Sequence, residues 1–515
     1  MTSLGGGRRL AVLAGLFVLA VGMAIYTVRP VHSASVGPDA AAPVIEFQRL
    51  LAGQPVEGHL TQTSKPLLDV VYGPIYELTG DWRPVAWSAI AAFGLVVVLA
   101  AVLANRIGGL ASGAFAAAAF LLSPILLVDL SLAYAITWMA LFLLIAGLAV
   151  TASKPRYGLA GVSLMLAALV RPEVLAVVAV AAVVLVVAAI WSAARHRPGP
   201  PRGAWLVLLG ALAIPILMAH DQLLFGDALF WSKTALQNSE GRAVRGLFGM
   251  IGWLWQHFLG LAALLPLAGV AGWVLITRRG WGLAVGLAGV TLGIAALFVI
   301  SGARGTFLSS RYLVPIDLGL LFASAIGVSA LDVPTIRRWI SQRVRPGAAH
   351  LVLPIAGGLL VALAIAPIGP LDTSVRASIA TQLRLHANAR RALSVIAKEL
   401  GPRPSWRGLP ASQDISSHPA VIVPPTLRAQ AVAELGLPLT DVAYSYATFL
   451  DPAAGRPGPG TLIYHDRRDD DPADPRYKLL EISRPTTIGP YRYVPIVADP
   501  AAGMWVVRVE DAAPS

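Results

Sequence analysis

The chain has 515 residues, of which 56% are hydrophobic and only 13% are charged, and its mean hydropathy is +0.69. Soluble domains carry about 25% charged residues, so this composition argues against a soluble protein and predicts a polytopic membrane protein. The chain has no cysteine, which excludes disulfides, thiol nucleophiles and cysteine-ligated metals. The net charge of +12 would suit a nucleic-acid partner only if the basic residues lay together.

Apolar segments long enough to cross about 30 Å of hydrocarbon recur along the first 366 residues. We predict about eleven transmembrane helices by this length rule. They are Leu10–Val28, Val85–Ala104, Leu110–Val128, Tyr134–Val150, Gly158–Val170, Val174–Trp191, Trp205–Ala219, Leu259–Ile276, Trp281–Ile300, Leu313–Ala330 and His350–Ala366. The first is long enough to stay in the membrane rather than act as a cleaved signal peptide. The fifth is short, and a half-buried hairpin with the sixth is an alternative.

The loops between these segments alternate in charge. With the N-terminus inside, every second loop is rich in arginine and lysine. Asp332 is the only acidic residue in this set of loops. The intervening loops hold many acids, as the positive-inside rule requires. The basic excess is therefore an orientation signal, and nucleic-acid binding loses its support. We predict a multi-pass protein of the plasma (inner) membrane with a cytoplasmic N-terminus.

The sequence divides into two regions with different compositions. Residues 1–370 form the predicted transmembrane domain, which has a long first outer loop at 29–84. In residues 371–515 charges become frequent and prolines cluster. Helical periodicity covers Arg376–Leu400, and short strand-like segments follow. The strands are Ala420–Val423, Thr461–Tyr464 and Met504–Val509, and Asp466–Asp474 is typical of a solvated loop. We predict a C-terminal extracytoplasmic α+β domain.

Charged residues collect in the predicted outer loops, and ionisable groups near lipid point to function. In the first outer loop, Asp39 can take a proton from a hydroxyl or help to bind a divalent cation. The alternative is a helix N-cap before Ala40–Leu51. Lys65 precedes Pro66, a residue typical of a first helical turn. Lys65 suits a phosphate at the membrane interface, or it forms an ion pair with Asp69 one turn later.

Two further outer loops contain candidates. Asp129 follows the third span and is either a metal or acceptor ligand or the cap of the fourth span. Arg171 and Glu173 join the fifth and sixth spans. An arginine on the outer side opposes the positive-inside rule and therefore suits a lipid phosphate. Pairing with Glu173 or snorkelling to headgroups is the alternative.

The last candidates lie in later outer loops. His220 and Asp221 open the loop after the seventh span and are acceptor or metal candidates. Arg304 and Arg311 precede the tenth span, where their guanidinium groups suit a phosphate. An ion pair between Arg311 and Asp317 is the alternative. No Walker loop, dinucleotide fingerprint, HExxH zinc motif or GxSxG elbow occurs in the sequence.

The order of these motifs resembles the polyprenyl-phosphate-sugar-dependent glycosyltransferases of the GT-C fold, which include protein O-mannosyltransferases and the lipid A aminoarabinose transferase. The likeness covers roughly Met1 to Ala366. The matching pieces are Asp39, Lys65-Pro66-Leu67-Leu68, Arg171-Pro172-Glu173 and Arg311-Tyr312-Leu313-Val314-Pro315. Many relatives have Asp-Glu at the first motif, where Asp39 is followed by Ala40, and His-Pro-Pro at the second, where this chain has Lys65-Pro66-Leu67.

The resemblance implies a GT-C-like glycosyltransferase that moves a sugar from a polyprenyl-phosphate donor to an extracytoplasmic acceptor. The acceptor would be a cell-envelope glycan, lipid or protein, and the reaction would invert the sugar. Asp39 would be the base, or would share a metal. Lys65, Arg171, Arg304 and Arg311 would bind the donor phosphate. Asp129, Glu173, His220 and Asp221 remain acceptor or metal candidates, and a divalent cation is the candidate cofactor.

Two other functions are compatible with the sequence. A secondary transporter or lipid flippase usually has internal repeats and polar sites near the bilayer midplane, whereas the charges here lie at one face. A non-catalytic envelope assembly protein would share the fold and have no need of Asp39. Residue usage rich in alanine, valine, glycine and arginine suggests a bacterial source.

Overall fold

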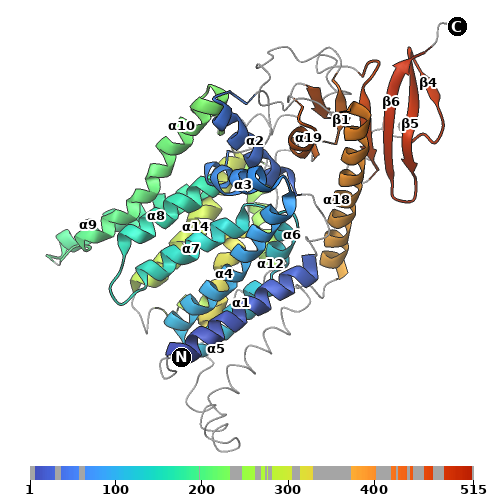
Figure 1. The fold of residues 1–515 in the computed structure, drawn as a ribbon. Helices are drawn as coiled ribbons and strands as arrows, with labels where there is room; N and C mark the ends of the chain where they lie inside the picture. The colour runs from blue at the N-terminus through green and yellow to red at the C-terminus, as the bar shows by residue number, and fades with distance from the viewer. Residues whose placement is uncertain are drawn as a thin grey trace, which may run out of the picture.

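The computed structural model is dominated by helices, with a sheet near the C-terminus (Figure 1). It describes residues 6–28, 36–56, 64–196, 198–231, 233, 246–260, 268–272, 275, 281–303, 314–328, 373–401, 419–424, 427–437, 441–444, 457–467 and 481–512. Arg304 and Arg311 lie outside the described residues, as do the predicted span His350–Ala366 and much of Leu259–Ile276.

The first part of the chain forms a bundle of apolar helices. They are α1 (Gly6–Val28), α2 (Pro38–Ala52), α3 (Pro66–Thr79), α4 (Trp82–Gly108), α5 (Leu110–Leu121), α6 (Pro124–Ser131), α7 (Ile136–Val150), α8 (Tyr157–Val170), α9 (Leu175–Ala194), α10 (Ala213–Phe225), α12 (Gly246–Gly260), α14 (Trp281–Ala303) and α15 (Val314–Gly327). The 3₁₀ segments η1 (Pro172–Val174) and η2 (Arg202–Leu212) precede α9 and α10.

Several of these helices have the length and composition of membrane spans. Among the described residues, Leu10–Val28, Trp82–Gly108, Pro172–Ala194 and Arg202–Phe225 are long and apolar enough to cross a bilayer, and shorter apolar helices accompany them. This supports a multi-pass helical membrane protein. The number of eleven spans stays a prediction.

Two expectations about the predicted spans differ from the structure. The segment Leu110–Val128 is broken into α5 and α6, because Pro124 has no N–H to continue the helix and Ser123 Oγ accepts a hydrogen bond from Leu126 N (3.5 Å) to start a new one. The fifth span, α8, packs mainly against α7 and η2 and much less against α9. The hairpin with the sixth span is therefore wrong.

The predicted first outer loop contains a pair of packed helices. α2 begins with Pro38 and ends at Gly53, whose φ of 62° lets its N–H bond the last carbonyls. The two helices approach so closely that a Cβ on Gly73 of α3 would lie 2.3 Å from the Phe47 ring of α2. Only glycine fits at that position.

The C-terminal part is an α+β unit built on a mixed sheet. Its elements are α18 (Thr373–Leu400), β1 (Val421–Val423), α19 (Arg428–Leu435), β2 (Val442–Tyr444), β3 (Leu462–Asp466), β4 (Thr486–Ile488), β5 (Tyr491–Asp499) and β6 (Met504–Asp511). The strand order is β2-β1-β3-β6-β5-β4. Strand β1 is parallel to β2 and β3, and the other pairs are antiparallel.

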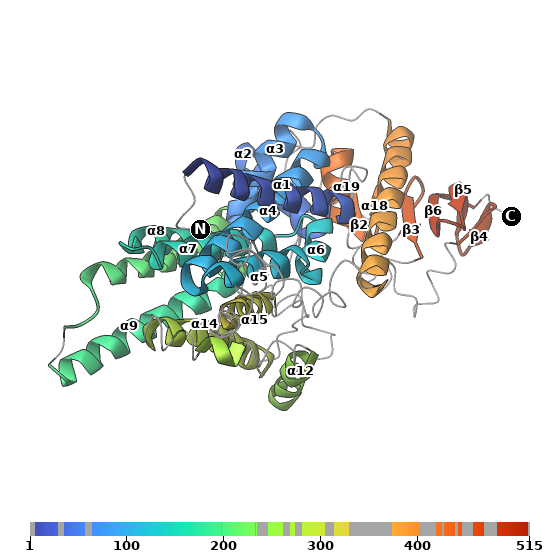
Figure 2. The ribbon, with the colours of Figure 1, turned by 90° about the horizontal axis from the view of Figure 1, so that it is seen from below.

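The predicted C-terminal helix and three strands are present, whereas β2, β4, β5 and α19 were not predicted from the sequence. The predicted loop Asp466–Asp474 is wrong at its first residue, because Asp466 ends β3 and is buried. Both ribbon views show α18 between the bundle and the outer strands (Figures 1 and 2). Helix α19 packs against α2.

Candidate active site

Asp39 is placed by the tight start of α2. Gly37 N donates a hydrogen bond to the carbonyl oxygen of Leu132 (2.9 Å) in the turn after α6. A Cβ on Gly37 would lie 2.4 Å from the Tyr134 ring, so glycine permits this approach. The N-cap of α2 is Gly37, and the cap alternative for Asp39 is therefore wrong. Asp39 lies in the first turn, where the helix dipole stabilises a carboxylate.

Lys65, at the far end of the same predicted loop, meets Asp39. Lys65 Nζ lies 3.7 Å from Asp39 Oδ1. Lys65 is 2% exposed and Asp39 is 8% exposed. A lysine is almost never buried this deeply unless its charge is compensated. The helix pair α2–α3 therefore brings the predicted base and a predicted phosphate-binding cation into one buried ion pair.

A second ionic cluster lies next to this pair and joins α3 to α10. His220 Nε2 contacts Asp69 Oδ2 (2.6 Å), and His220 Nδ1 contacts Asp221 Oδ1 (3.3 Å). Asp221 Oδ2 accepts a hydrogen bond from Trp231 N (2.7 Å). His220 and Asp221 lie inside α10, so their predicted loop position is wrong. α10 continues past the apolar segment because these buried partners satisfy its polar residues.

Three side chains of this cluster could hold a metal ion. One ligand atom each from Glu46, Asp69 and His220 lies within 4.8 Å of the others. Within the described part of the chain, Glu46 Oε2 and Asp69 Oδ1 are buried without a hydrogen-bond partner. Burial raises the pKa of both carboxyl groups, and the charge of Asp69 raises the pKa of Glu46 further. Two carboxylates and an imidazole are a ligand set that suits a divalent cation such as zinc.

Aromatic residues hold α3 in register with the bundle. The Tyr72 hydroxyl donates to the carbonyl oxygen of Ala133 (3.0 Å) and accepts from Trp138 Nε1 (2.9 Å). Ala133 has a positive φ of 54°, which is uncommon for a residue other than glycine. Tyr72 therefore ties α3 to the turn that also anchors Gly37. Sequence reasoning missed this link, since an aromatic residue in a helix gives no signal of its partner.

Arg171 and Asp129 are both buried near these elements. Arg171 Nη2 lies 3.4 Å from Glu173 Oε1, so the predicted pairing with Glu173 is present. Arg171 ends α8, which packs against α3 and α10. Asp129 belongs to α6, and α7 has Ala135 as its N-cap, so Asp129 does not cap the fourth span. Both residues remain candidates for the donor or the acceptor.

Glu46 was not predicted, although the sequence contained a signal for it. It follows Asp39 by seven residues, which is two helical turns, so both lie on one face of α2. Lys65 precedes α3 as its N-cap residue, and Asp69 follows it by four residues, which is about one helical turn. Recognising helices inside the long loop would have pointed to this face.

The fold and the site together define a class of protein: an apolar helical bundle with a buried ionic cluster at one end, beside an α+β domain. Solved structures share the fold. ArnT from Cupriavidus metallidurans, solved with undecaprenyl phosphate, is similar with a TM-score of 0.51 and 14% identity, over 99% of this chain and 100% of ArnT.

Archaeal oligosaccharyltransferases are similar as well. That of Archaeoglobus fulgidus, tethered to an acceptor peptide, gives a TM-score of 0.52 and 12% identity over 88% of this chain and 69% of that one. AglB from the same organism, in complex with an inhibitory peptide and a dolichol-phosphate, gives 0.51 and 11% over 89% and 70%. The resemblance to GT-C glycosyltransferases is thus confirmed at the level of the fold. No family model and no curated protein matches the sequence.

Proposed function

We propose that this protein is an integral-membrane glycosyltransferase that moves a sugar from a polyprenyl-phosphate donor to an acceptor outside the cytoplasm. The observation that carries the proposal is the buried pair of Asp39 and Lys65 at one end of an apolar bundle. A base and a phosphate-binding cation are the two groups that such a transfer needs. The shared fold with ArnT and AglB, which were solved with lipid phosphates, supports the same conclusion.

The proposed reaction has one step. The Asp39 carboxylate removes the proton of the acceptor hydroxyl, and the acceptor oxygen attacks the anomeric carbon. The bond from that carbon to the phosphate oxygen breaks, and polyprenyl phosphate leaves with the electron pair. Lys65 and Arg171 stabilise the charge that develops on the leaving phosphate. Because a single displacement occurs, the sugar is inverted and no covalent enzyme intermediate forms.

In the proposed orientation, this site lies at the extracytoplasmic face of the plasma membrane. The basic residues of alternate loops favour a cytoplasmic N-terminus, and α2 and α3 then lie outside together with residues 371–515. The C-terminal domain would hold or orient the acceptor, because it packs against α2. An envelope glycan, lipid or protein would be the acceptor, and the donor carries a hexosyl or pentosyl group.

A divalent cation fits the second cluster. Glu46, Asp69 and His220 would hold it, and Asp221 would orient the imidazole of His220. Such a cation would supply positive charge beside the donor phosphate. The catalytic steps assigned to Asp39 and Lys65 do not depend on it.

The transferase and transporter hypotheses predict different polarity for the interior of the helical bundle. A transporter needs a polar site near the middle of the membrane. The bundle instead contains an apolar cavity of about 320 Å³, whose lining includes Leu103, Phe120, Leu144 and Phe322. Leu103 lies about 30 Å along α4 from Trp82, at 1.5 Å per residue. This cavity suits hydrocarbon rather than a polar solute, which argues against a transporter of polar solutes and leaves the lipid flippase to the transfer assay.

The test is a transfer assay with purified protein, radiolabelled polyprenyl-phosphate sugars and an envelope extract as acceptor. Replacing Asp39 with Asn should lower transfer at least a hundredfold, the low end of general-base effects. Asp499→Asn is the matched control, because Asp499 pairs with the exposed Arg391 away from the helices that hold Asp39. Equal activity of the Asp39 variant would exclude Asp39 as the base. If folded wild-type protein transfers no sugar from any donor, transport or a non-catalytic role is favoured instead. Lipid flux across the membrane would then be measured to test for transport.

A further inference from the structure

The short helix α19 connects the C-terminal sheet to the candidate active site. α19 lies between β1 and β2, which pair in parallel, so it is the crossover of a β-α-β unit. A helix of eight residues is not stable alone and must pack against a neighbour. α19 packs more extensively on α2 than on β2 or α18, and Ala429, Ala431 and Val432 are buried. α19 therefore links the sheet to α2.

One polar contact joins α19 to the bundle. Trp82 Nε1 at the start of α4 donates a hydrogen bond to Glu434 Oε1 (2.8 Å), and Gln430 Nε2 donates to the same oxygen (2.6 Å). Trp82 is 2% exposed, and its ring lies against that of Tyr76 with 4.1 Å between centroids. Through Tyr76 the contact reaches α3, the helix that begins next to Lys65.

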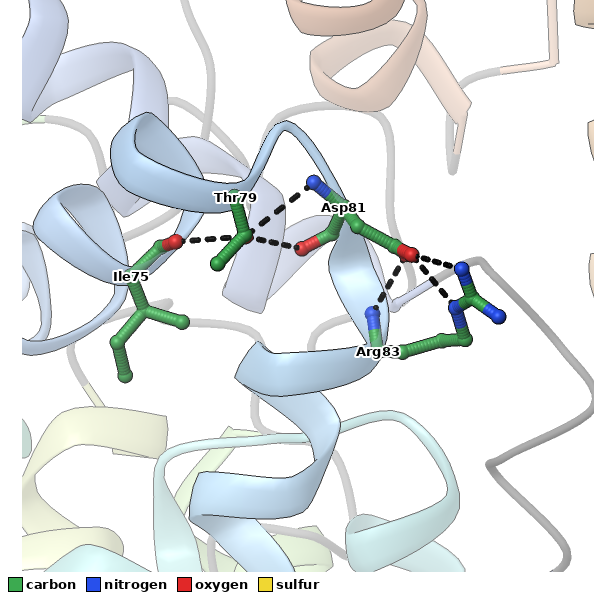
Figure 3. Close-up of polar contacts among 4 residues, drawn as sticks. All are labelled: Ile75, Thr79, Asp81 and Arg83. Carbon is green, nitrogen blue, oxygen red and sulfur yellow. Dashed lines mark hydrogen bonds and ion pairs between the residues drawn. The ribbon is translucent and has the colours of Figure 1, made fainter.

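The position of Trp82 is fixed by the turn between α3 and α4. The Thr79 hydroxyl donates to the carbonyl oxygen of Ile75 (2.7 Å), and Asp81 Oδ1 accepts from Arg83 N (3.0 Å) (Figure 3). The Arg83 side chain also pairs with Asp81. These contacts define the turn from which α4 begins and so place Trp82 beside α19.

We propose that Glu434 is a positioning residue that couples the C-terminal domain to the α2–α3 helix pair through Trp82, and so sets the distance between Asp39 and Lys65. The inference rests on the proposed function for its meaning, since the coupling would let acceptor bound by the domain reach the base. The structural part of the coupling can be measured without any transfer.

The charges around Glu434 make this contact sensitive to pH. Burial raises the pKa of Glu434 to about 7, while hydrogen bonds from Gln430 and Trp82 and the charge of Arg390 act in the opposite direction. Asp81 at the cap of α4 raises the pKa further. Of the other packed elements, α4 carries Arg83, α18 carries Arg391, and α2 carries Asp39, Glu46 and Arg49.

The sign of the pH effect follows from this raised pKa. In the docked state Glu434 holds its proton more tightly than a free glutamate does, so docking is strongest at low pH. The stabilisation falls as pH rises from the ordinary range of glutamate toward about 7 and changes little above that. A neutral side chain that still accepts the Trp82 hydrogen bond should remove this dependence.

The experiment compares Glu434→Gln, Glu434→Ala and Trp82→Phe with the control Glu481→Gln, whose side chain pairs with Arg467 beside the sheet. Hydrogen exchange of residues 38–52 is measured at pH 5 and pH 8, after correction for intrinsic rates. In wild type, α2 should exchange at least fivefold faster at pH 8. Glu434→Gln should lose that difference, and Glu434→Ala and Trp82→Phe should exchange at least fivefold faster at pH 5. The control should follow wild type within twofold.

The pH profile of transfer adds the catalytic readout. The kcat of Glu434→Ala should fall at least tenfold with KM for the donor within threefold, and Glu434→Gln should restore kcat at pH 6 to within twofold. Exchange of α2 that is the same in wild type, Glu434→Ala and Trp82→Phe would overturn the coupling. If wild type transfers nothing, the proposed function fails, while the exchange data still decide the coupling.

Discussion

Breaking the Lys65–Asp39 pair tests the candidate site most directly, through Lys65→Met. The methionine keeps the length of the side chain and removes its charge, which leaves the buried Asp39 carboxylate without this partner. At 3.7 Å the gross attraction is about 4 kcal/mol with an effective dielectric constant of 20. Removing one member of a buried pair typically costs about 3–5 kcal/mol. We expect Lys65→Met to lower the free energy of unfolding by about 3 kcal/mol.

The double variant separates stability from catalysis. Asp39→Asn in the Lys65→Met background removes the uncompensated charge, so it should recover at least half of the lost stability. Transfer activity should stay at least a hundredfold below wild type, because the base is missing. The assay is reversible unfolding of the detergent-solubilised protein for wild type, both single variants and the double variant. A coupling energy below about 0.5 kcal/mol, as for an exposed pair, would refute the reasoning that this pair is buried and dry.

Two further outcomes follow from the geometry of the same helices. Protein purified from zinc-supplemented medium should contain about one divalent ion per chain by elemental analysis, and Glu46→Gln with Asp69→Asn should reduce this at least tenfold; an unchanged metal content would exclude the cluster as its ligands. Gly73→Val makes the new side chain overlap with the Phe47 side chain. The free energy of unfolding, measured by thermal unfolding, should therefore fall by about 1–3 kcal/mol. Gly22→Val, which has open space around its Cβ, should lose less than half as much.

The helical membrane architecture could be predicted because it rests on local rules. Segment length and apolar content located α1, α4, α7 and α9 closely, and the GT-C resemblance agrees with the solved structures that share the fold. Errors arose where an apolar segment and a helix have different ends. Pro124 breaks an apolar run into two helices, and α10 extends past its apolar run to Phe225, where Gly226 takes a left-handed conformation.

The site was harder to predict because its contacts join distant parts of the sequence. Asp39 and Lys65 were named separately for the two ends of a reaction, and their pairing depends on α2 packing against α3. Asp69 meets His220 across 151 positions of sequence. Periodicity reports which residues share a face of one helix, whereas the partner of that face is set by tertiary packing, which no local pattern encodes.

The charge balance of the site explains why its two clusters belong together. Among the residues that the structure describes, the carboxyl groups of Asp39, Glu46, Asp69 and Asp221 are buried, and three of them pair with Lys65 or His220. An anionic donor phosphate would be repelled by an excess of carboxylates. Protons on Glu46 and Asp69, whose pKa values burial raises, or a bound cation would remove that excess. Binding of the donor should therefore depend on how the second cluster is neutralised, even though Asp39 and Lys65 carry the proposed chemistry.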